Sequence, residues 1–144
     1  MSLPAALLAR ATDRRAFRIA PRDTNYFVIL FDPETEGYSN ICVVEIFERG
    51  GRTPPNSHRT AHEFFYVLHG RGVAHCDGEA TSLFKGDALL LRPGAEHVVE
   101  NVGDSKLYTL TVMTPDEDFA ALIRAGAPVD LDAEDVAVLS GPLR

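Results

Sequence analysis

The chain is divided into short runs of β-branched and aromatic residues, and most of these runs begin or end with glycine, asparagine or aspartate. The runs are NYFVILF (25–31), NICVVEIF (40–47), HEFFYVLHG (62–70), GVAHCDGEATSL (72–83), DALLLRPG (87–94), HVVEN (97–101) and KLYTLTVM (106–113). Such side chains favour strands, and turn residues at this spacing are typical of a sandwich or barrel. Within the fourth run, Asp77-Gly78 suits the positive φ angles of a tight hairpin turn. The sequence therefore predicts an all-β, antiparallel fold.

Helices are expected only near the two ends of the chain. Residues 2–13 carry a proline in the first turn, followed by alanine and leucine, which are strong helix formers. The segment 114–126 opens with the spacing of a capping box, has proline at the first helical position, and places its apolar residues on one face. A second C-terminal helix is expected to start at Asp132. The pattern predicts short N- and C-terminal helices around a β core.

The chain has the size of one ordinary domain: 144 residues, of which 45% are hydrophobic. It shows no linker, internal repeat or low-complexity run. We expect three parts within this single domain. Residues 1–34 form the N-terminal helix and a leading strand, residues 35–115 form the β-barrel, and residues 116–144 form a helical segment packed on the barrel.

The formal net charge of −7 limits the kinds of partner. A surface that binds phosphates needs positive charge, so we expect neither nucleic acid nor an anionic membrane as a partner, and a small neutral or cationic molecule is easier to accommodate. Cys42 and Cys76 form no CxxC motif and are expected to be reduced thiols. The N-terminus lacks the features of a signal peptide, and no apolar stretch approaches the length of a membrane span. We therefore expect a cytoplasmic protein.

Two blocks of glycine and polar residues stand at fixed spacings. The first consists of Gly50, Asn56, His58, Glu63 and Gly70, and the second of Gly86, Arg92, Gly94, His97 and Asn101. Both blocks resemble the paired motifs of the cupin family, in its small single-domain form. The resemblance covers roughly residues 35–115 and implies a jelly-roll-like antiparallel β-barrel, also called a double-stranded β-helix, with a divalent metal inside.

The resemblance also implies the metal ligands. His58, Glu63 and His97 match three ligand positions of the family, whereas Asn56 stands where the family has its first histidine. An amide oxygen is neutral and less basic than imidazole, so Asn56 is expected to bind a metal weakly or through a water molecule. In the second block Arg92 replaces the usual proline, and the proline follows one residue later.

Strand geometry supports this ligand set independently. Side chains two residues apart on a strand point the same way, so Asn56 and His58 would face one space, which a barrel closes with residues from other strands. Two imidazoles and one carboxylate suit iron, nickel, manganese or zinc and leave positions open for water or substrate. We therefore expect one divalent transition metal per chain.

The other candidate residues are assigned by strand parity. His62 should point away from the metal if Glu63 points toward it, and Phe65 and Val67, which share the parity of Glu63, should line the barrel wall. His69 is expected in a turn. Parity does not decide between His75 and Cys76, and either one could line the cavity.

The most favoured function is a mononuclear metal-dependent enzyme that acts on a small organic molecule, such as a dioxygenase, isomerase or lyase, with the dioxygenase preferred. Glu63 is the candidate catalytic residue, because a carboxylate that leaves the metal can carry a proton. Two alternatives remain: a non-catalytic small-molecule binding or sensing module, and a barrel whose metal site is weakened or empty. A homodimer is also expected, because residues 40–47 and 107–113 alternate poorly and should be buried on both faces, and because the resemblance points to dimers.

Overall fold

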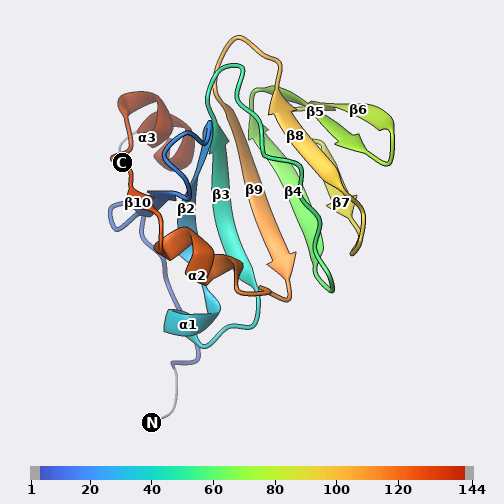
Figure 1. The fold of residues 1–144 in the computed structure, drawn as a ribbon. Helices are drawn as coiled ribbons and strands as arrows, with labels where there is room; N and C mark the ends of the chain where they lie inside the picture. The colour runs from blue at the N-terminus through green and yellow to red at the C-terminus, as the bar shows by residue number, and fades with distance from the viewer. Residues whose placement is uncertain (1–3, 142–144) are drawn as a thin grey trace.

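The structure is a computed structural model that describes residues 4–141, and it is built on two antiparallel β-sheets (Figure 1). The larger sheet has the strand order β10-β1-β2-β3-β9-β4-β7, and the smaller has the order β6-β5-β8. The larger sheet comprises β1 (Arg15–Arg18), β2 (Asn25–Phe31), β3 (Ile41–Phe47), β4 (His62–His69), β7 (Ala88–Leu91), β9 (Leu107–Thr114) and β10 (Ala127–Pro128). The smaller comprises β5 (Arg71–Cys76), β6 (Glu79–Phe84) and β8 (His97–Asn101). The predicted all-β, antiparallel fold is confirmed.

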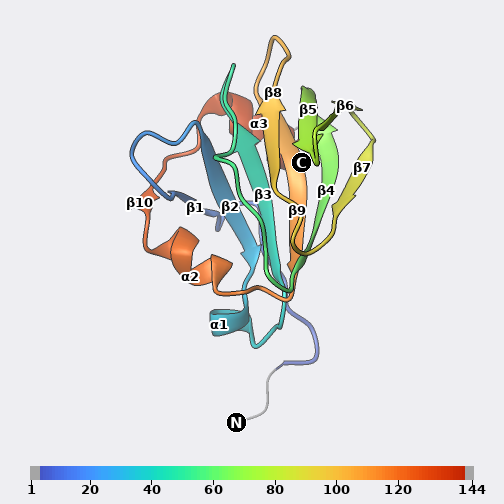
Figure 2. The ribbon, with the colours of Figure 1, turned by 45° about the vertical axis from the view of Figure 1, so that its right-hand side comes forward.

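One apolar core joins the two sheets. In the turned view of Figure 2 the smaller sheet lies over β9 and β4 of the larger one. The buried cluster between them consists of Phe47, Phe65, Val67, Ala74, Leu83, Leu91, Val99 and Leu107. Phe65 and Val67 are each 1% exposed, so the prediction that they line the interior is confirmed. Burial of these inward faces is the main force that holds the sheets together.

The outward face of β3 and β9 in the larger sheet is covered by the chain's own C-terminal segment. Val44 in β3 and Tyr108 in β9 belong to a second buried cluster, against which Leu139 of α3 (Ala133–Ser140) packs. The expected burial of these two strands on both faces is thus confirmed. Because α3 and the segment before it supply the cover, this burial requires no second subunit.

A buried polar network anchors α3 to the sheet. The hydroxyl groups of Tyr26 and Tyr108 each donate to the carboxylate of Asp135 at 2.7 Å, and Nζ of Lys106 donates to the same carboxylate at 3.1 Å. Asp135 is 1% exposed. The side chain of Asp132 accepts from the N–H of Asp135 at 2.9 Å and completes a capping box, as the predicted start of this helix requires.

The predicted hairpin turn is present between β5 and β6. Asp77 has φ 51° and Gly78 has φ 78°, so both central residues adopt the left-handed conformation expected of this pair. The turn sets the register in which Cys76 opposes Glu79 and His75 opposes Ala80.

The predicted N-terminal helix is wrong for the residues that are described. Residues 4–14 contain no helix, and the first positions of the expected segment, 2 and 3, lie outside the described residues. Leu7 is 43% exposed and Leu8 is 72% exposed. A short helix depends on packing an apolar face, and these two leucines remain largely exposed.

The first C-terminal helix starts later than the sequence predicts. Thr114 is the last residue of β9 and pairs with His62, so it cannot act as a helix cap. Glu117 and Asp118 have φ 51° and 63°, and α2 spans Phe119–Arg124. A further short helix, α1 (Pro33–Glu36), forms between β2 and β3. None of the helices in the described part of the chain has the length and apolar character needed to cross a membrane.

Candidate metal centre

Three segments bring two imidazoles and one carboxylate together. Glu63 lies in β4, His97 begins β8, and His58 lies in the loop before β4. Nε2 of His58 is 2.8 Å from Oε2 of Glu63, and Nε2 of His97 is 3.5 Å from Oε1 of the same carboxylate. One ligand atom from each residue lies within 4.8 Å of the others. The three residues expected as ligands therefore converge in space.

The loop that carries His58 is held from two sides. The carbonyl oxygen of His58 accepts from the N–H of Gly94 at 2.7 Å, and Gly94 has a φ of 83°, which favours glycine. The carboxylate of Glu117 accepts from the three successive N–H groups of residues 59–61, at distances from 2.5 to 3.2 Å. These backbone hydrogen bonds lower the pKa of Glu117, and the one from Thr60 has the largest effect.

The hydrogen bonding of His97 shows which ring nitrogen faces the centre. The His97 side chain is 2% exposed, and its Nδ1 lies 3.0 Å from the carbonyl oxygen of Ala95. A carbonyl oxygen can only accept, so Nδ1 carries the proton and Nε2 of the neutral ring has a lone pair. This buried Nε2 has no hydrogen-bond partner among the described residues. A lone pair facing the Glu63 carboxylate needs a cation between them, either a proton or a metal.

The pKa values of Glu63 and His97 are shifted by the proximity of the carboxylate to the imidazoles. Burial raises the pKa of Glu63, but the hydrogen bonds and charges of His58 and His97 outweigh it and hold this pKa below its ordinary value. Burial lowers the pKa of His97, but the nearby Glu63 carboxylate and the contact of Nδ1 with the carbonyl oxygen of Ala95 make the net shift upward. Each charge stabilises its opposite, so a metal that binds here competes with a proton.

The two separations between imidazole and carboxylate suit one transition metal ion. With metal–ligand bonds of about 2.1 Å, two donors at a right angle on one ion lie about 3 Å apart. The measured separations of 2.8 and 3.5 Å lie on either side of this value. Two imidazoles and a carboxylate suit iron, nickel, manganese or zinc.

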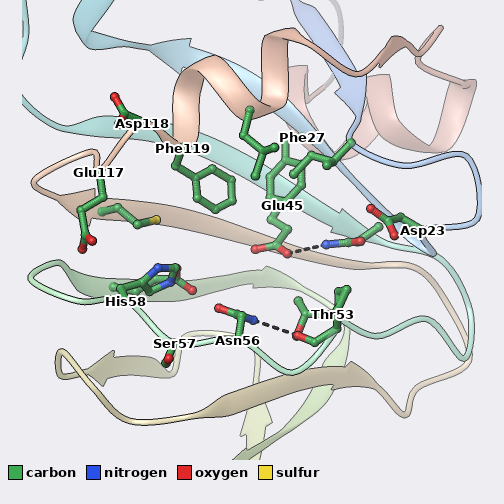
Figure 3. A pocket seen from close by; sticks show the side chains of 16 residues that line it. Asp23, Phe27, Glu45, Thr53, Asn56, Ser57, His58, Glu117, Asp118 and Phe119 are labelled. Carbon is green, nitrogen blue, oxygen red and sulfur yellow. Dashed lines mark hydrogen bonds and ion pairs between the residues drawn. The ribbon is translucent and has the colours of Figure 1, made fainter.

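Asn56 lies next to this group, but its amide nitrogen is used elsewhere. Asn56 and His97 form an antiparallel bridge, so their side chains lie on the same side of the backbone pair. Nδ2 of Asn56 donates to the carbonyl oxygen of Pro54 at 2.9 Å (Figure 3). Only Oδ1 of the amide remains as a ligand atom. Weak or water-mediated binding by Asn56 stays a prediction.

A cavity of about 430 Å³ opens beside His58 and Glu63 (Figure 3). It is lined by Ile19, Asp23, Asn25, Phe27, Glu45, Thr53, Pro54, Asn56, Ser57, His58, Glu63, Met113, Glu117, Asp118, Phe119 and Leu122. The rings of Phe27 and Phe119 meet edge to face, with centroids 5.4 Å apart, and form part of the wall. Apolar side chains combined with polar groups that face one enclosed space are typical of a small-molecule site.

Sequence reasoning missed a second carboxylate in this cavity. Glu45 and Asn25 are each 3% exposed, and Nδ2 of Asn25 donates to Oε2 of Glu45 at 2.8 Å. Burial and the charge of Glu63 raise the pKa of Glu45 to about 8, although hydrogen bonds from Asn25 and Thr111 oppose the shift. The available signal was a glutamate inside the apolar run VVEIF, at the inward-facing parity of its strand.

The remaining histidines lie outside the centre. His62 is exposed whereas Glu63 is buried, so the prediction that they point to opposite faces is confirmed. Nε2 of His75 is 2.7 Å from Oε1 of Glu100, and the His75 side chain is 43% exposed. Within the described residues, neither His75 nor Cys76 lines the cavity beside His58.

Fold and site together define a small antiparallel β-domain with an internal His–Glu–His group beside a cavity lined by both apolar and polar side chains. The model of the cupin domain family matches residues 43–113, which include all three of these side chains. Residues 43–113 of the chain are therefore a cupin domain.

Relatives share this part of the chain. An uncharacterized protein of Methanocaldococcus jannaschii is 35% identical over 66 residues, which are 46% of this chain and 53% of that protein. The oxalate-binding protein of Thermotoga maritima is 32% identical over 68 residues, 43% of this chain and 56% of that protein. The chain thus spans about half the length of these curated relatives.

A solved structure supports the fold. The crystal structure of a predicted oxalate decarboxylase from Thermotoga maritima superimposes with a TM-score of 0.65 at 22% identity. The match covers 74% of this chain and 97% of that one. At this level of identity the likeness shows a shared fold.

Proposed function

We propose that this chain is a metal-dependent enzyme that acts on a small organic molecule. His58, Glu63 and His97 would hold one divalent transition metal, and the adjoining cavity would hold the substrate. The reaction class that we favour is that of a dioxygenase, with isomerase and lyase as the other members of the proposal. Cupin folds serve several reactions, so the fold alone does not select one.

One observation carries the proposal. Nε2 of His97 is buried, has no hydrogen-bond partner among the described residues, and faces a carboxylate that also contacts His58. A group of this kind is expensive to bury unless it binds a cation. The cavity beside it provides space for a second molecule.

The residues of the chain have distinct roles in this proposal. The bound metal supplies Lewis acidity and open coordination positions. His97 is fixed in the tautomer that presents Nε2, because its Nδ1–H donates to Ala95. Glu63 can exchange a proton with a molecule in the cavity, since both imidazoles stabilise its charge. Phe27 and Phe119 exclude water from the space next to these polar groups.

A non-catalytic binding module is the second candidate. It is favoured by the relative whose name is oxalate-binding protein, which shares 68 aligned residues with this chain. Both candidates need the same cavity. They differ in whether the bound molecule is converted.

Metal titration tests the first part of the proposal. Protein prepared without an affinity tag would be stripped with a chelator and titrated with zinc, nickel, manganese or, anaerobically, iron(II). We expect one ion per chain. His97→Ala and His58→Ala should each lower the affinity at least about tenfold, because even indirect metal partners have effects of this size. The control His62→Ala, an exposed histidine beside Glu63, should bind metal as the wild type does.

Substoichiometric binding that reconstitution does not restore, or equal affinity in all variants, would overturn the metal assignment. Oxygen consumption by the iron(II)-loaded protein, measured with diketones, catechols, thiols and flavonols, then tests the favoured reaction. A fully metallated protein that binds such compounds but converts none would be a binding module.

A further inference from the structure

The pair formed by Asn25 and Glu45 is a polar feature that the metal centre does not use. Asn25 lies on β2 and Glu45 on the neighbouring strand β3, and the register places Glu45 opposite Phe27, two residues along from Asn25. Both side chains line the cavity, and Figure 3 shows Glu45 extending into it from the sheet. Glu45 and Glu63 lie at different levels of the sheet. On β9, the strand between theirs, Glu45 pairs with Thr109, whereas Glu63 pairs with Met113.

The pair has unused hydrogen-bonding capacity. Nδ2 of Asn25 donates to Oε2 of Glu45, but Oδ1 of Asn25 is buried and has no partner among the described residues. An amide oxygen has two lone pairs and can accept from a hydroxyl or an amine. Since Asn25 is 3% exposed and borders the cavity, a molecule in the cavity can supply that donor.

A purely structural role does not account for the pair. Inside a sheet, apolar side chains of similar volume commonly stabilise a fold as well as a buried polar pair does, or better. Phe27, directly opposite Glu45 and two residues from Asn25 on the same inward face, shows that this face accepts an apolar side chain. If the pair served only to stabilise the fold, each of its buried acceptors should have a hydrogen-bond partner.

The charge of the cavity limits what can bind there. Its ionisable lining groups other than His58 are five carboxyl groups, from Asp23, Glu45, Glu63, Glu117 and Asp118. Neither lysine nor arginine lines the cavity within residues 4–141. An anion next to Asn25 would face the unpaired lone pairs of Asn25 Oδ1 without a positive partner, whereas a hydrogen-bond donor would complete them.

We propose that Asn25 and Glu45 form a subsite that binds a hydroxyl or amine group of an uncharged or cationic organic molecule. The inference rests on the proposed function, because it takes the cavity as the place where the small molecule binds. It also separates this chain from its relative named for oxalate, since a carboxylate group is the wrong partner for this subsite.

Three probes that share one ring test the subsite: benzyl alcohol, benzylamine and benzoate, which are neutral, cationic and anionic at pH 7. Each is titrated at millimolar concentrations into the metal-free protein and into the zinc-loaded protein. Dissociation constants come from NMR titration, with the side-chain amide of Asn25 as the local reporter. In the metal-free protein we expect the alcohol and the amine to bind at least about tenfold more tightly than benzoate and to shift the Asn25 amide signal.

Two variants assign the effect to the pair. Glu45→Gln keeps the size of the side chain and should weaken benzylamine binding about tenfold, while benzoate binding stays equal or improves. Asn25→Leu should weaken both donor probes. Glu100→Gln changes a glutamate that does not line the cavity and should leave all three probes unaffected. If the amide spectrum shows that Asn25→Leu does not fold, the binding of the probes to Glu45→Gln alone tests the subsite.

The proposal is overturned if benzoate binds the metal-free protein as well as benzylamine does. It is also overturned if Glu45→Gln binds benzylamine like the wild type, or if none of the probes binds. Failure of metal binding would instead reject the proposed metal centre, and the metal-free titrations measure the subsite independently of it.

Discussion

Asn56 and His97 are direct backbone partners: the N–H of Asn56 donates to the carbonyl oxygen of His97 at 3.1 Å, and the N–H of His97 donates to that of Asn56 at 2.8 Å. A pair with both hydrogen bonds places its two side chains on one side of the bridge. A histidine at position 56 would therefore extend toward the side on which His97 meets Glu63.

Asn56→His should tighten metal binding. Imidazole is more basic than an amide, and a direct ligand should raise the affinity by at least about tenfold, the lower end of the range seen for indirect metal partners. Isothermal titration of metal-free variant and wild type measures the change. Arg52→His is the matched control, because Arg52 forms the other isolated bridge of this segment but is exposed. Equal or weaker affinity in Asn56→His would mean that position 56 does not face the metal.

Glu117→Gln should weaken metal binding several-fold without removing a ligand. The Glu117 carboxylate accepts from the three N–H groups that follow His58, and a neutral amide offers one acceptor oxygen in place of two. Hydrogen exchange at residues 59–61 should become faster in the variant. Asp118→Asn, the neighbouring change, is the control. Unchanged exchange would show that Glu117 does not hold the loop.

Asp135→Ala should lower the free energy of unfolding by about 3 kcal/mol. The change leaves the buried hydroxyl groups of Tyr26 and Tyr108 without their acceptor and removes one of the partners of Lys106. Urea denaturation measures the loss, with Asp130→Ala, an exposed aspartate in the preceding segment, as the control. A loss as small as that of the control would show that α3 is held mainly by its apolar contacts.

Glu45→Gln should stabilise the metal-free protein increasingly as the pH rises. The folded pKa of Glu45 is about 8, above its ordinary value of 4.5. Between these values the folded state binds more protons at this carboxyl than the unfolded state, so a higher pH lowers the free energy of unfolding of the wild type. By pH 7 the wild type should have lost on the order of 3 kcal/mol relative to the variant. Urea denaturation from pH 4.5 to 8 tests this, and a difference that does not change with pH would contradict it.

A homodimer remains a prediction, and the outward face of β4 and β7 is the surface that would form it. Tyr66 is 39% exposed and Leu90 is 53% exposed, and both lie on this pair of adjacent strands. Large apolar side chains on an edge strand favour association. Light scattering should give twice the chain mass of 15.7 kDa, and Leu90→Arg should shift it toward the monomer. A wild-type mass near that of one chain at micromolar concentration would reject the dimer.

The β core was predictable because its signals are local. Turn residues such as Asp77 and Gly78 determine where strands end, and the parity of Glu63 determines which neighbours face inward. The N-terminal helix was not predictable in the same way. Its residues have helical propensity, but a short helix forms only if its apolar face finds a surface, and that information is not local.

The site was predicted only in part for a related reason. His58, Glu63 and His97 could be selected from the spacing of two motifs. Asn25 and Glu45 carry no motif, and their proximity depends on the register between β2 and β3, which the local pattern does not specify. Likewise, the role of Glu117 depends on a loop nearly sixty residues earlier in the chain.

The residues that line the cavity come from two parts of the sequence, the cupin domain and the segments that flank it. His58, Glu63 and His97 lie within the cupin domain at 43–113, but Asn25, Phe27 and Phe119 come from segments on either side of it. These flanking segments can change without disturbing the motifs that carry the His–Glu–His group. Relatives that share the cupin domain can therefore keep the same reactive centre and still select different molecules, so in this architecture chemistry and selectivity can evolve separately.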